Sequence, residues 1–186
     1  TRRDYLNKCG ALELFYCGDD EFGEFLNKLN NFHALRWGKP AFDEEAVRFH
    51  KLVAARLPAS GGRIRCSLLR FNGDCISVLY DVTIGGQRFN LQSGYYEDFD
   101  RRVSLGPLHL GFAIEEGFKD AGIHHYDLLA GGGKRSYYKR HFQGERVEFR
   151  TVQLVFRPLL RSIYRAQVDM PSGFVGNRRN RIEKIA

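Results

Sequence analysis

The sequence predicts an α+β fold in which a central mixed, mostly antiparallel sheet ends in one βαβ crossover and carries helices on both faces. Three observations predict it: two helical patterns precede the strands, glycine turns join a meander, and a helix then separates two further strands. With 186 residues the chain is long enough for one full core. We therefore expect a single domain over 1–186, with a core over about 11–157 and a basic tail over about 171–186.

The first third of the chain is expected to form one strand and two helices. Residues 11–17 are apolar and aromatic, and Gly18 follows them. Apolar residues then recur at helical spacing from Phe22 to Leu35, until Gly38-Lys39-Pro40 ends the pattern. Asp43 has the position of an N-cap for a second helix. The buried face of that helix is predicted to contain Val47, His50, Val53, Ala54 and Leu57.

The middle of the chain has the pattern of an antiparallel meander. Strands are predicted over 63–71 and 74–84, because Asn72-Gly73 between them is a strong signal for a two-residue hairpin turn. Gly85-Gly86 forms the next turn, and a third strand is expected over 87–96. In this register Cys75 lies opposite Arg70 and not opposite Cys66, so a direct disulfide within the hairpin is not expected.

A crossover is predicted after the meander. A helix over 106–120 is expected to bury Leu110, Ile114, Phe118 and Ala121, and a short strand over 124–130 follows it. A strand that follows a helix that follows a strand favours parallel pairing. We expect this strand to pair with the strand over 87–96. A last long strand is predicted over 146–156, with a helix starting at Pro158.

Charge and cysteine content narrow the class of protein. Lys and Arg number 29 against 22 acidic residues, which gives a net charge of +7. Such a surplus favours an anionic partner, although a merely soluble basic surface explains it equally well. No apolar run approaches the roughly 20 residues that span a bilayer. The four cysteines form no CxxC pair, which favours reduced thiols in the cytoplasm and argues against a metal site.

The most informative stretch begins at Gly106-Pro107. This turn opens the crossover helix, and a glycine turn at a helix N-terminus is a common way to hold a phosphate. Beyond the next strand, Gly131-Gly132-Gly133 leads to Tyr138-Lys139-Arg140. A proton donor and cations are thereby placed near the turn.

Several short motifs occur here in an order typical of one family. They are Leu35-Arg36-Trp37, Pro40-Ala41-Phe42, Phe49-His50, Gln92-Ser93-Gly94-Tyr95, Ser104-Leu105-Gly106-Pro107, Tyr126-Asp127-Leu128-Leu129-Ala130-Gly131 and Tyr138-Lys139-Arg140. Through them the chain resembles GNAT-fold acyltransferases. More narrowly, it resembles the CelD/BcsL-type acetyltransferase domain of proteins linked to cellulose biosynthesis, a relative of the FemAB aminoacyltransferases. The resemblance implies the C-terminal half of a longer protein, preceded by a GNAT-like half.

The activity that this resemblance implies is transfer of an acyl group from acyl-CoA to an amine acceptor, in cell-envelope or exopolysaccharide biosynthesis. Direct attack by the amine requires an oxyanion donor, a proton donor for the leaving thiolate and a base. Backbone N–H groups along 87–96 are candidates for the first role, and Tyr138 for the second, with Tyr137 as a competitor. Asp127 is the candidate base, and Glu97 and Asp98 remain open as alternatives.

The resemblance also implies the binding residues. Those for the acyl donor are Arg102, Ser104, Gly106 and Lys139, and those for the substrate are Arg36, Trp37, Gln92 and Tyr95. The donor is expected in a notch between the strands over 87–96 and 124–130.

One departure from the GNAT pattern keeps two alternatives open. The usual loop reads Arg/Gln-x-x-Gly-x-Gly/Ala, whereas the segment from Arg102 has its first glycine one position late, at Gly106, and lacks the second. FemAB-like relatives share this departure and use aminoacyl-tRNA. Cations available for tRNA are Lys134, Arg135, Lys139, Arg140, Arg146 and Arg150. The other alternative is a half-domain without catalytic activity that scaffolds a partner.

Overall fold

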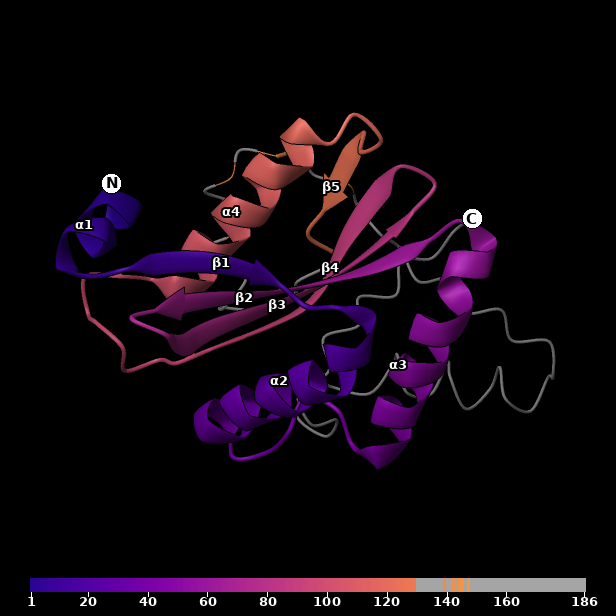
Figure 1. Cartoon of the computed structure of the whole chain (residues 1–186), viewed down its shortest axis with the longest axis horizontal. Coiled ribbons are helices and arrows are strands. Elements are labelled where there is room, and N and C mark those ends of the chain that lie inside the picture. Colours follow the sequence, from indigo (N-terminus) through magenta and orange to yellow (C-terminus); the bar gives the residue numbers. More distant parts are fainter. Residues whose placement is uncertain (130–138, 140–141, 143, 146, 148–186) are drawn as a thin grey trace, which may run out of the picture. The chain divides into compact units, whose positions relative to one another are not determined.

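A five-stranded sheet in the order β1-β2-β3-β4-β5 forms the centre of the molecule (Figure 1). The computed structural model describes residues 1–129, 139, 142, 144, 145 and 147. The chain divides into two compact units, Thr1–Glu145 and Arg146–Ala186, and the fold described here is that of the first. The predicted strand over 146–156, the helix from Pro158 and the basic tail lie outside the described residues.

The strands match the predicted meander and crossover. They are β1 Leu12–Tyr16, β2 Arg63–Phe71, β3 Asp74–Ile84, β4 Gln87–Tyr95 and β5 His125–Asp127. The first three neighbouring pairs are antiparallel, whereas β4 and β5 are parallel. The mixed sheet and the pairing of β5 with β4 are thereby confirmed.

Glycine turns set the register of the meander. Asn72 and Gly73 have φ angles of 51° and 89°, the left-handed values that a two-residue hairpin turn requires. Gly85 and Gly86, with φ angles of 57° and 75°, make the next turn in the same way. Arg70 pairs with Cys75, as the count from the turn predicts.

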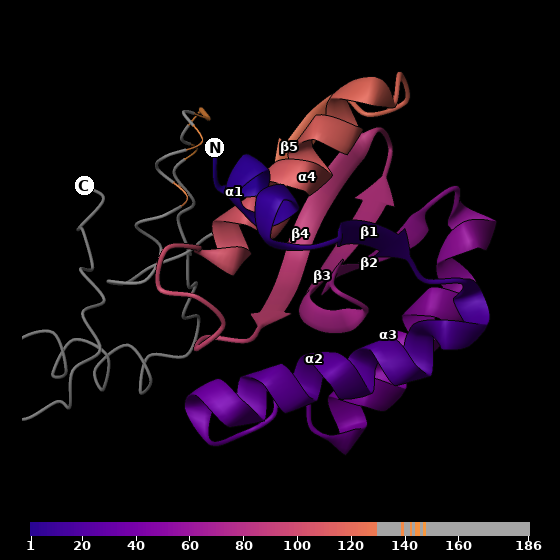
Figure 2. The same cartoon turned by 60° about the vertical axis from the view of Figure 1, so that its left-hand side comes forward.

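Helices cover both faces of the sheet, with α1 and α4 above it and α2 and α3 below it in Figures 1 and 2. Their bounds are α1 Arg2–Cys9, α2 Phe22–Trp37, α3 Glu44–Arg56 and α4 Leu105–Lys119, with short 3₁₀ turns η1 Asp19–Glu21 and η2 Leu57–Ser60. Helix α2 ends at Gly38, whose φ is 72°. Helix α3 begins at Asp43, whose Oδ1 accepts from the N–H of Ala46 at 2.8 Å.

The core is divided by the sheet. Below it, apolar residues of α2 pack on Val78 and Tyr80 of β3. Above it, Leu79 packs against α4, and Leu69 packs with α1. Helix α1 was not predicted, because Leu6 is the only residue of that helix that is buried and no apolar period arises.

The buried face of α4 differs from the prediction. Phe118 is 87% exposed, and Ala121 is exposed as well. The residues that are buried include several small ones, which allow the helix to approach the sheet closely: Leu105, Gly106, His109, Leu110, Ala113 and Gly117. A pattern based on large apolar side chains misses such a face, since glycine and histidine carry little hydrophobic signal.

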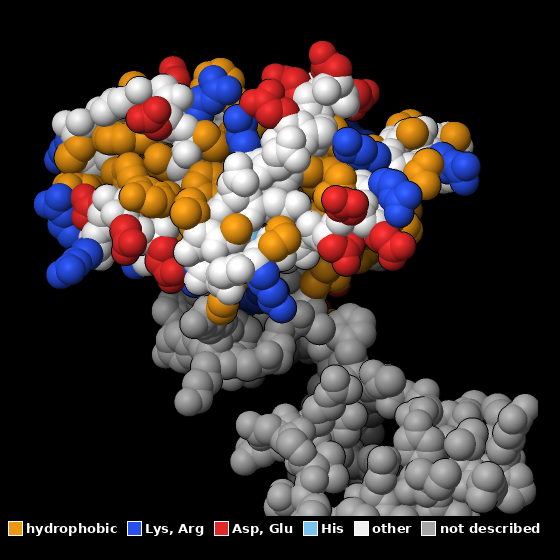
Figure 3. Space-filling view, turned by 90° about the horizontal axis from the view of Figure 1, so that it is seen from below, with side chains coloured by type: hydrophobic (Ala, Val, Ile, Leu, Met, Phe, Trp, Pro, Cys, Tyr) orange, Lys and Arg blue, Asp and Glu red, His pale blue; other side chains and the backbone are white. Residues whose placement is uncertain are grey.

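Helix α3 is only half buried. Its predicted apolar face contacts the core at Val47, Ala54 and the following Leu57, but no residue within the helix is fully buried. Phe49 and Leu52 are 61% and 56% exposed. On the face seen from below in Figure 3, hydrophobic side chains accordingly appear among acidic and basic ones.

Candidate active site

Strand β4 is paired with β5 over only part of its length. The parallel pairing runs from Gln87 to Phe89. Immediately after it, a bulge interrupts the pairing with β3, so that Leu91 is an extra residue between Asn90 and Gln92. From Gln92 to the end of β4, no described strand pairs with the side of β4 that faces away from β3. This segment is the free edge of β4, and it belongs to the strand beside which the sequence predicts a notch.

The backbone of Ser93 faces this free edge. The N–H of Tyr96 donates to Ile76 of β3 at 3.0 Å, so alternation along the strand directs Gly94 to β3 and Ser93 away from it. Both polar groups of Ser93 are nevertheless bonded. Its N–H donates to Oε1 of Gln92 at 3.1 Å, and its carbonyl lies 3.1 Å from Nε2 of His33 on α2. Because a carbonyl only accepts, His33 carries a hydrogen on Nε2.

The N-terminus of α4 lies beside the end of β4. A Cβ built on Gly106 would be 2.8 Å from a ring carbon of Tyr95, so this glycine allows the first turn of α4 to pack against that ring. Ser104 occupies the N-cap position, is exposed and makes no side-chain capping bond. The first N–H groups of a helix have no intrahelical acceptors and attract anions. The expected anion site is thereby adjacent to the free edge.

Arg36 forms a cluster with three other residues at this end of β4. Its Nη1 donates to the hydroxyl of Tyr95 at 2.5 Å, and its Nε lies 3.2 Å from a carboxylate oxygen of Glu97. The guanidinium also stacks on the rings of Trp37 and Tyr95, with its central carbon 4.9 and 4.6 Å from their centroids. Three predicted substrate-binding residues, Arg36, Trp37 and Tyr95, are thus brought together. Gln92, the fourth, lies on the free edge.

Arg102, a predicted donor-binding residue, is held by its neighbours. Its Nε and Nη2 donate to the carboxylate of Asp100 at 3.1 and 2.9 Å, and its guanidinium lies over the ring of Tyr5. This carboxylate raises the pKa of Arg102, and the guanidinium lowers the pKa of Asp100. A phosphate would therefore compete with Asp100 for this cation.

Asp127 and Lys139 both contact the turn that follows β5. Oδ1 of Asp127 accepts from the N–H of Leu129 at 2.7 Å, and Leu129 has a φ of 57°, unusual for a leucine. The ammonium of Lys139 donates to the carbonyls of Leu128 and Leu129. Burial lowers the pKa of Lys139, and the charge of Asp127 opposes that shift. These contacts fix the turn that leaves β5.

The other predicted catalytic residues are distributed as follows. Tyr138 and Tyr137 lie outside the described residues. Asp98 is exposed in the loop after β4, whereas Glu97 is paired with Arg36. The geometry does not bring Asp98 to a defined partner within the described part of the chain.

A series of buried hydrogen bonds connects α4, β2 and β3 to the backbone of β4. Oγ of Ser77 donates to the carbonyl of Gly94 at 3.2 Å and lies 2.8 Å from Nδ1 of His109. Since Ser77 has one hydrogen to donate, His109 must donate from Nδ1 and accept on Nε2 from Ser67, 2.9 Å away. Burial lowers the pKa of His109 to about 3, so its ring is neutral. This series of hydrogen bonds ends at Gly94, the residue after Ser93.

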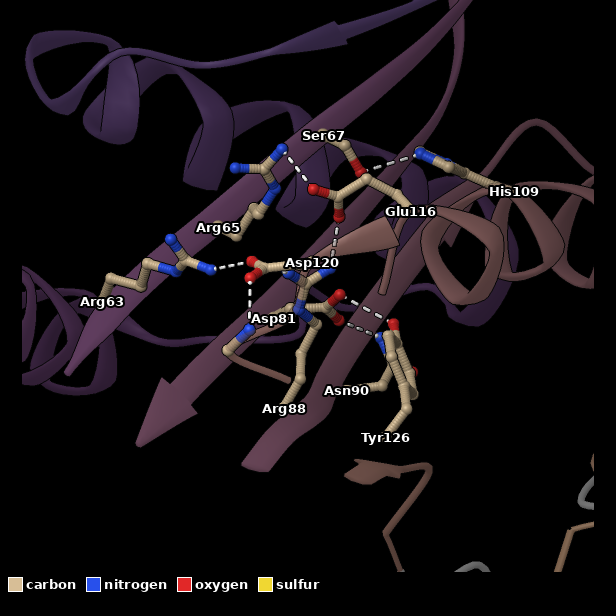
Figure 4. A network of polar contacts seen from close by, with 11 residues as sticks. Arg63, Arg65, Ser67, Asp81, Arg88, Asn90, His109, Glu116, Asp120 and Tyr126 are labelled. Carbon is tan, nitrogen blue, oxygen red and sulfur yellow. Dashed lines mark hydrogen bonds and ion pairs between the residues drawn. The ribbon is translucent and has the colours of Figure 1, made fainter. Parts of the chain in front are cut away.

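A second buried network underlies the paired part of β4 (Figure 4). Asp81 accepts from the hydroxyl of Tyr126 at 2.7 Å and from Nδ2 of Asn90 at 2.9 Å. Burial raises the pKa of Asp81 to about 6. The fully buried Arg88 pairs with Glu116 of α4. Together these contacts connect β3, β4 and β5 with one another and with α4.

Sequence reasoning missed His33, His109, Asp81 and Arg88. Single polar residues within apolar helices and strands resemble solvent-facing positions in a sequence, and only the fold shows that they are partnered. Among the described residues, no group of His, Cys, Asp and Glu is arranged to hold a metal ion. In the same part of the chain, no helix is long and apolar enough to cross a membrane.

A scan against protein families now identifies the fold. Residues 1–140 match the family described as the acetyltransferase (GNAT) domain. The chain belongs to this family. The fold predicted from the resemblance is confirmed, and the protein is an acyltransferase of the GNAT type. No curated protein matches the sequence.

Solved structures share the GNAT fold at low sequence identity. A possible acetyltransferase from Clostridium difficile 630 superposes with a TM-score of 0.57 at 9% identity, over 78% of this chain and 98% of its own. A predicted acetyltransferase with acetyl-CoA from Clostridium acetobutylicum superposes with a TM-score of 0.54 at 13% identity, over 77% of this chain and 96% of its own. An aminoglycoside acetyltransferase from an uncultured soil metagenomic sample, in complex with sisomicin, superposes with a TM-score of 0.53 at 9% identity, over 78% of this chain and 95% of its own.

The site fits the donor that GNAT acetyltransferases use, acetyl-CoA. The arm of this molecule carries amides, which suit the outward-facing backbone of Ser93. Its phosphates suit the N-terminus of α4 at Ser104 and Gly106.

Proposed function

We propose that this GNAT domain transfers an acetyl group from acetyl-CoA to the amine of a small molecule at the free edge of β4. The observation that carries the proposal is the segment from Gln92 to Tyr95, which no described strand pairs on the side away from β3 and whose Tyr95 ring packs against Gly106 at the N-terminus of α4. A single ligand with an amide-bearing arm and a phosphorylated end can occupy both features. When bound, the donor supplies a thioester carbonyl close to the Ser93 backbone.

The donor's phosphates interact, in this proposal, with the first turn of α4. Ser104 and Gly106 provide backbone N–H groups there, and the hydroxyl of Ser104 is exposed. Arg102 is the predicted cation for these phosphates, and a phosphate would compete with Asp100 for it.

Proton transfers are assigned to acidic residues at the ends of β4 and β5 and to a tyrosine beyond β5. Asp127 is the proposed base for the incoming amine, with Glu97 and Asp98 as alternatives. Tyr138 is the proposed acid that protonates the leaving thiolate, and Tyr137 is its competitor. Trp37 and Tyr95, with the guanidinium between their rings, form the proposed wall of the acceptor site.

A second candidate function is transfer from aminoacyl-tRNA, as in the FemAB relatives. The observations that favour it are the glycine that comes one position late and the engagement of Arg102 by Asp100. The CelD/BcsL-type assignment, the role in cell-envelope or exopolysaccharide biosynthesis, the cytoplasmic setting and the preceding GNAT-like half stay predictions of the sequence. A half-domain that only scaffolds a partner is the third candidate.

Thermal unfolding with each ligand separates these candidates. We expect acetyl-CoA to raise the unfolding temperature at both about 50 and about 300 mM salt, because a specific ligand stabilises by mass action. Bulk tRNA should have an effect that disappears at the higher salt. Stabilisation by aminoacyl-tRNA alone would favour the second candidate, and no stabilisation by either ligand would favour the scaffold. Transfer is then measured by mass spectrometry with a panel of small amines.

A further inference from the structure

The free edge of β4 is closed by the protein's own side chains. Unpaired edge groups usually bond to water, yet both polar groups of Ser93 have protein partners. Gln92 covers the N–H with its amide oxygen, and His33 covers the carbonyl with its Nε2–H. The two partners come from different elements, β4 and α2, and converge on one residue.

These two contacts resemble those that a bound amide-bearing arm would make. The amides of the donor's arm offer carbonyls and N–H groups, the same two kinds of group that Gln92 and His33 now present to Ser93. Because a trans amide points its carbonyl and its N–H in opposite directions, one amide replaces one of the two contacts. The Gln92 oxygen is itself an amide carbonyl, so it occupies the position that a ligand carbonyl would take.

We propose that Gln92 and His33 form a latch on Ser93, and that amide groups of the acyl-donor arm must displace these two contacts to bind. The inference rests on the proposed function and deepens it. The latch lowers affinity for every ligand that carries the arm, and it leaves affinity for the nucleotide end unchanged. Gln92 thereby sets the affinity for the donor, because the donor must replace the contact that Gln92 makes with Ser93.

The surroundings allow the latch to open without moving the strand. Gln92 and His33 are only half buried, so both side chains can rotate towards solvent. The neighbouring carbonyl of Gly94 is held by Ser77 on the other side of β4. A Cβ on Gly94 would lie 2.9 Å from Cβ of Phe32, which shows how closely α2 packs on the strand.

Calorimetric titration of the full chain tests the latch with two probes. One is coenzyme A, and the other is adenosine 3′,5′-bisphosphate, which resembles its nucleotide end and lacks the arm. We expect Gln92→Ala to bind coenzyme A about two- to tenfold more tightly, the size expected for releasing one hydrogen bond. Affinity for the bisphosphate should not change. Gln87→Ala is the matched control, since Gln87 is exposed on the β4 segment that pairs with β5.

His33 provides an independent second variant. His33→Leu removes the donor that bonds to the carbonyl of Ser93. This variant should also bind coenzyme A more tightly, with its affinity for the bisphosphate unchanged. His33→Gln retains an N–H donor and should restore the original affinity. In the parent protein, the side-chain NMR signals of Gln92 and His33 should shift with coenzyme A and not with the bisphosphate.

The outcomes distinguish the latch from the proposed function. Weaker binding of coenzyme A to Gln92→Ala would show that this amide holds the donor, and unchanged binding would show that it obstructs nothing. Either result overturns the latch while the proposed function stands. If the parent protein binds neither probe, the proposed function fails and the latch fails with it.

Discussion

His109 shows how one buried residue makes stability depend on pH. Its ring is enclosed by Ser67 and Ser77 and stays neutral, because burial lowers its pKa from 6.5 to about 3. The unfolded chain keeps the ordinary value, so between about pH 6.5 and 3 the unfolded state binds a proton that the folded state does not. The free energy of unfolding therefore decreases as the pH falls through this range. Asp81 has the opposite effect. Because its pKa is raised to about 6, the folded state takes up a proton before the unfolded state does, and the free energy of unfolding increases as the pH falls below about 6.

Replacing His109 should remove its share of this pH dependence. We expect His109→Asn to lower the unfolding temperature at pH 7.5, because hydrogen bonds to two serines are disturbed. Between pH 7 and 5, however, its unfolding temperature should fall less than that of the parent. Calorimetry at several pH values measures both effects. His125→Asn is the control because His125 is exposed on β5, and a slope equal to the parent's in His109→Asn would contradict the assignment.

Tyr138 carries the prediction for catalysis at the residue scale. Tyr138→Phe should leave folding and acetyl-CoA binding nearly unchanged and lower turnover about a hundredfold, as expected on losing a general acid. Turnover is measured once an acceptor amine is found. Tyr16→Phe on β1, at the other edge of the sheet, is the matched control. Full turnover in Tyr138→Phe would move the role to Tyr137 or to water.

At the scale of elements, strands were predicted better than helix faces. The bounds of β2 and β3 agree with the prediction because Asn72-Gly73 requires positive φ and fixes the hairpin. The face of α4 was wrong at Phe118, since glycine and histidine residues mark its contact with the sheet. Arg36, Trp37 and Tyr95 do meet in one cluster, whereas the partner of His33 depends on a tertiary approach that no local pattern encodes.

The contact between α4 and β4 can be tested by a single methyl group. In Gly106→Ala the new Cβ would overlap the ring of Tyr95, which must then shift away from Arg36. We expect a loss of about 1–3 kcal/mol in stability and about tenfold weaker acetyl-CoA binding. Gly111→Ala on the same helix has open space and is the control, with stability unchanged or slightly higher. Equal acetyl-CoA affinity in both variants would remove Gly106 from the donor site.

Lys139 holds the turn after β5. Its ammonium donates to two carbonyls, so we expect Lys139→Met to loosen this turn and raise the hydrogen-exchange rate of the Leu129 N–H. The salt dependence of acetyl-CoA binding should stay the same, with Lys119→Met as the control on α4. A flatter dependence in Lys139→Met would instead show that Lys139 neutralises a donor phosphate, as the resemblance to the family implies.

At the scale of the whole molecule, the four thiols provide a test of redox state. Burial raises the pKa of the Cys17 thiol to about 11 and that of Cys66 further, while Cys9 is exposed. We expect four titratable thiols after denaturation without reductant, and a fast reaction of Cys9 alone in the native protein. Fewer than four in the denatured chain would reveal a disulfide and argue against a reducing compartment.

The parallel pairing of β5 has a consequence for the order of folding. The meander from β2 to β4 is joined by two tight turns, so its contacts are local and form early. Strand β5 reaches β4 only across the segment that contains α4, and it contributes three residue pairs. Loop closure of this kind is slow relative to hairpin formation. The pairing of β5 is therefore expected to form after the meander, and a chain interrupted before His125 lacks the strand that pairs with the first part of β4.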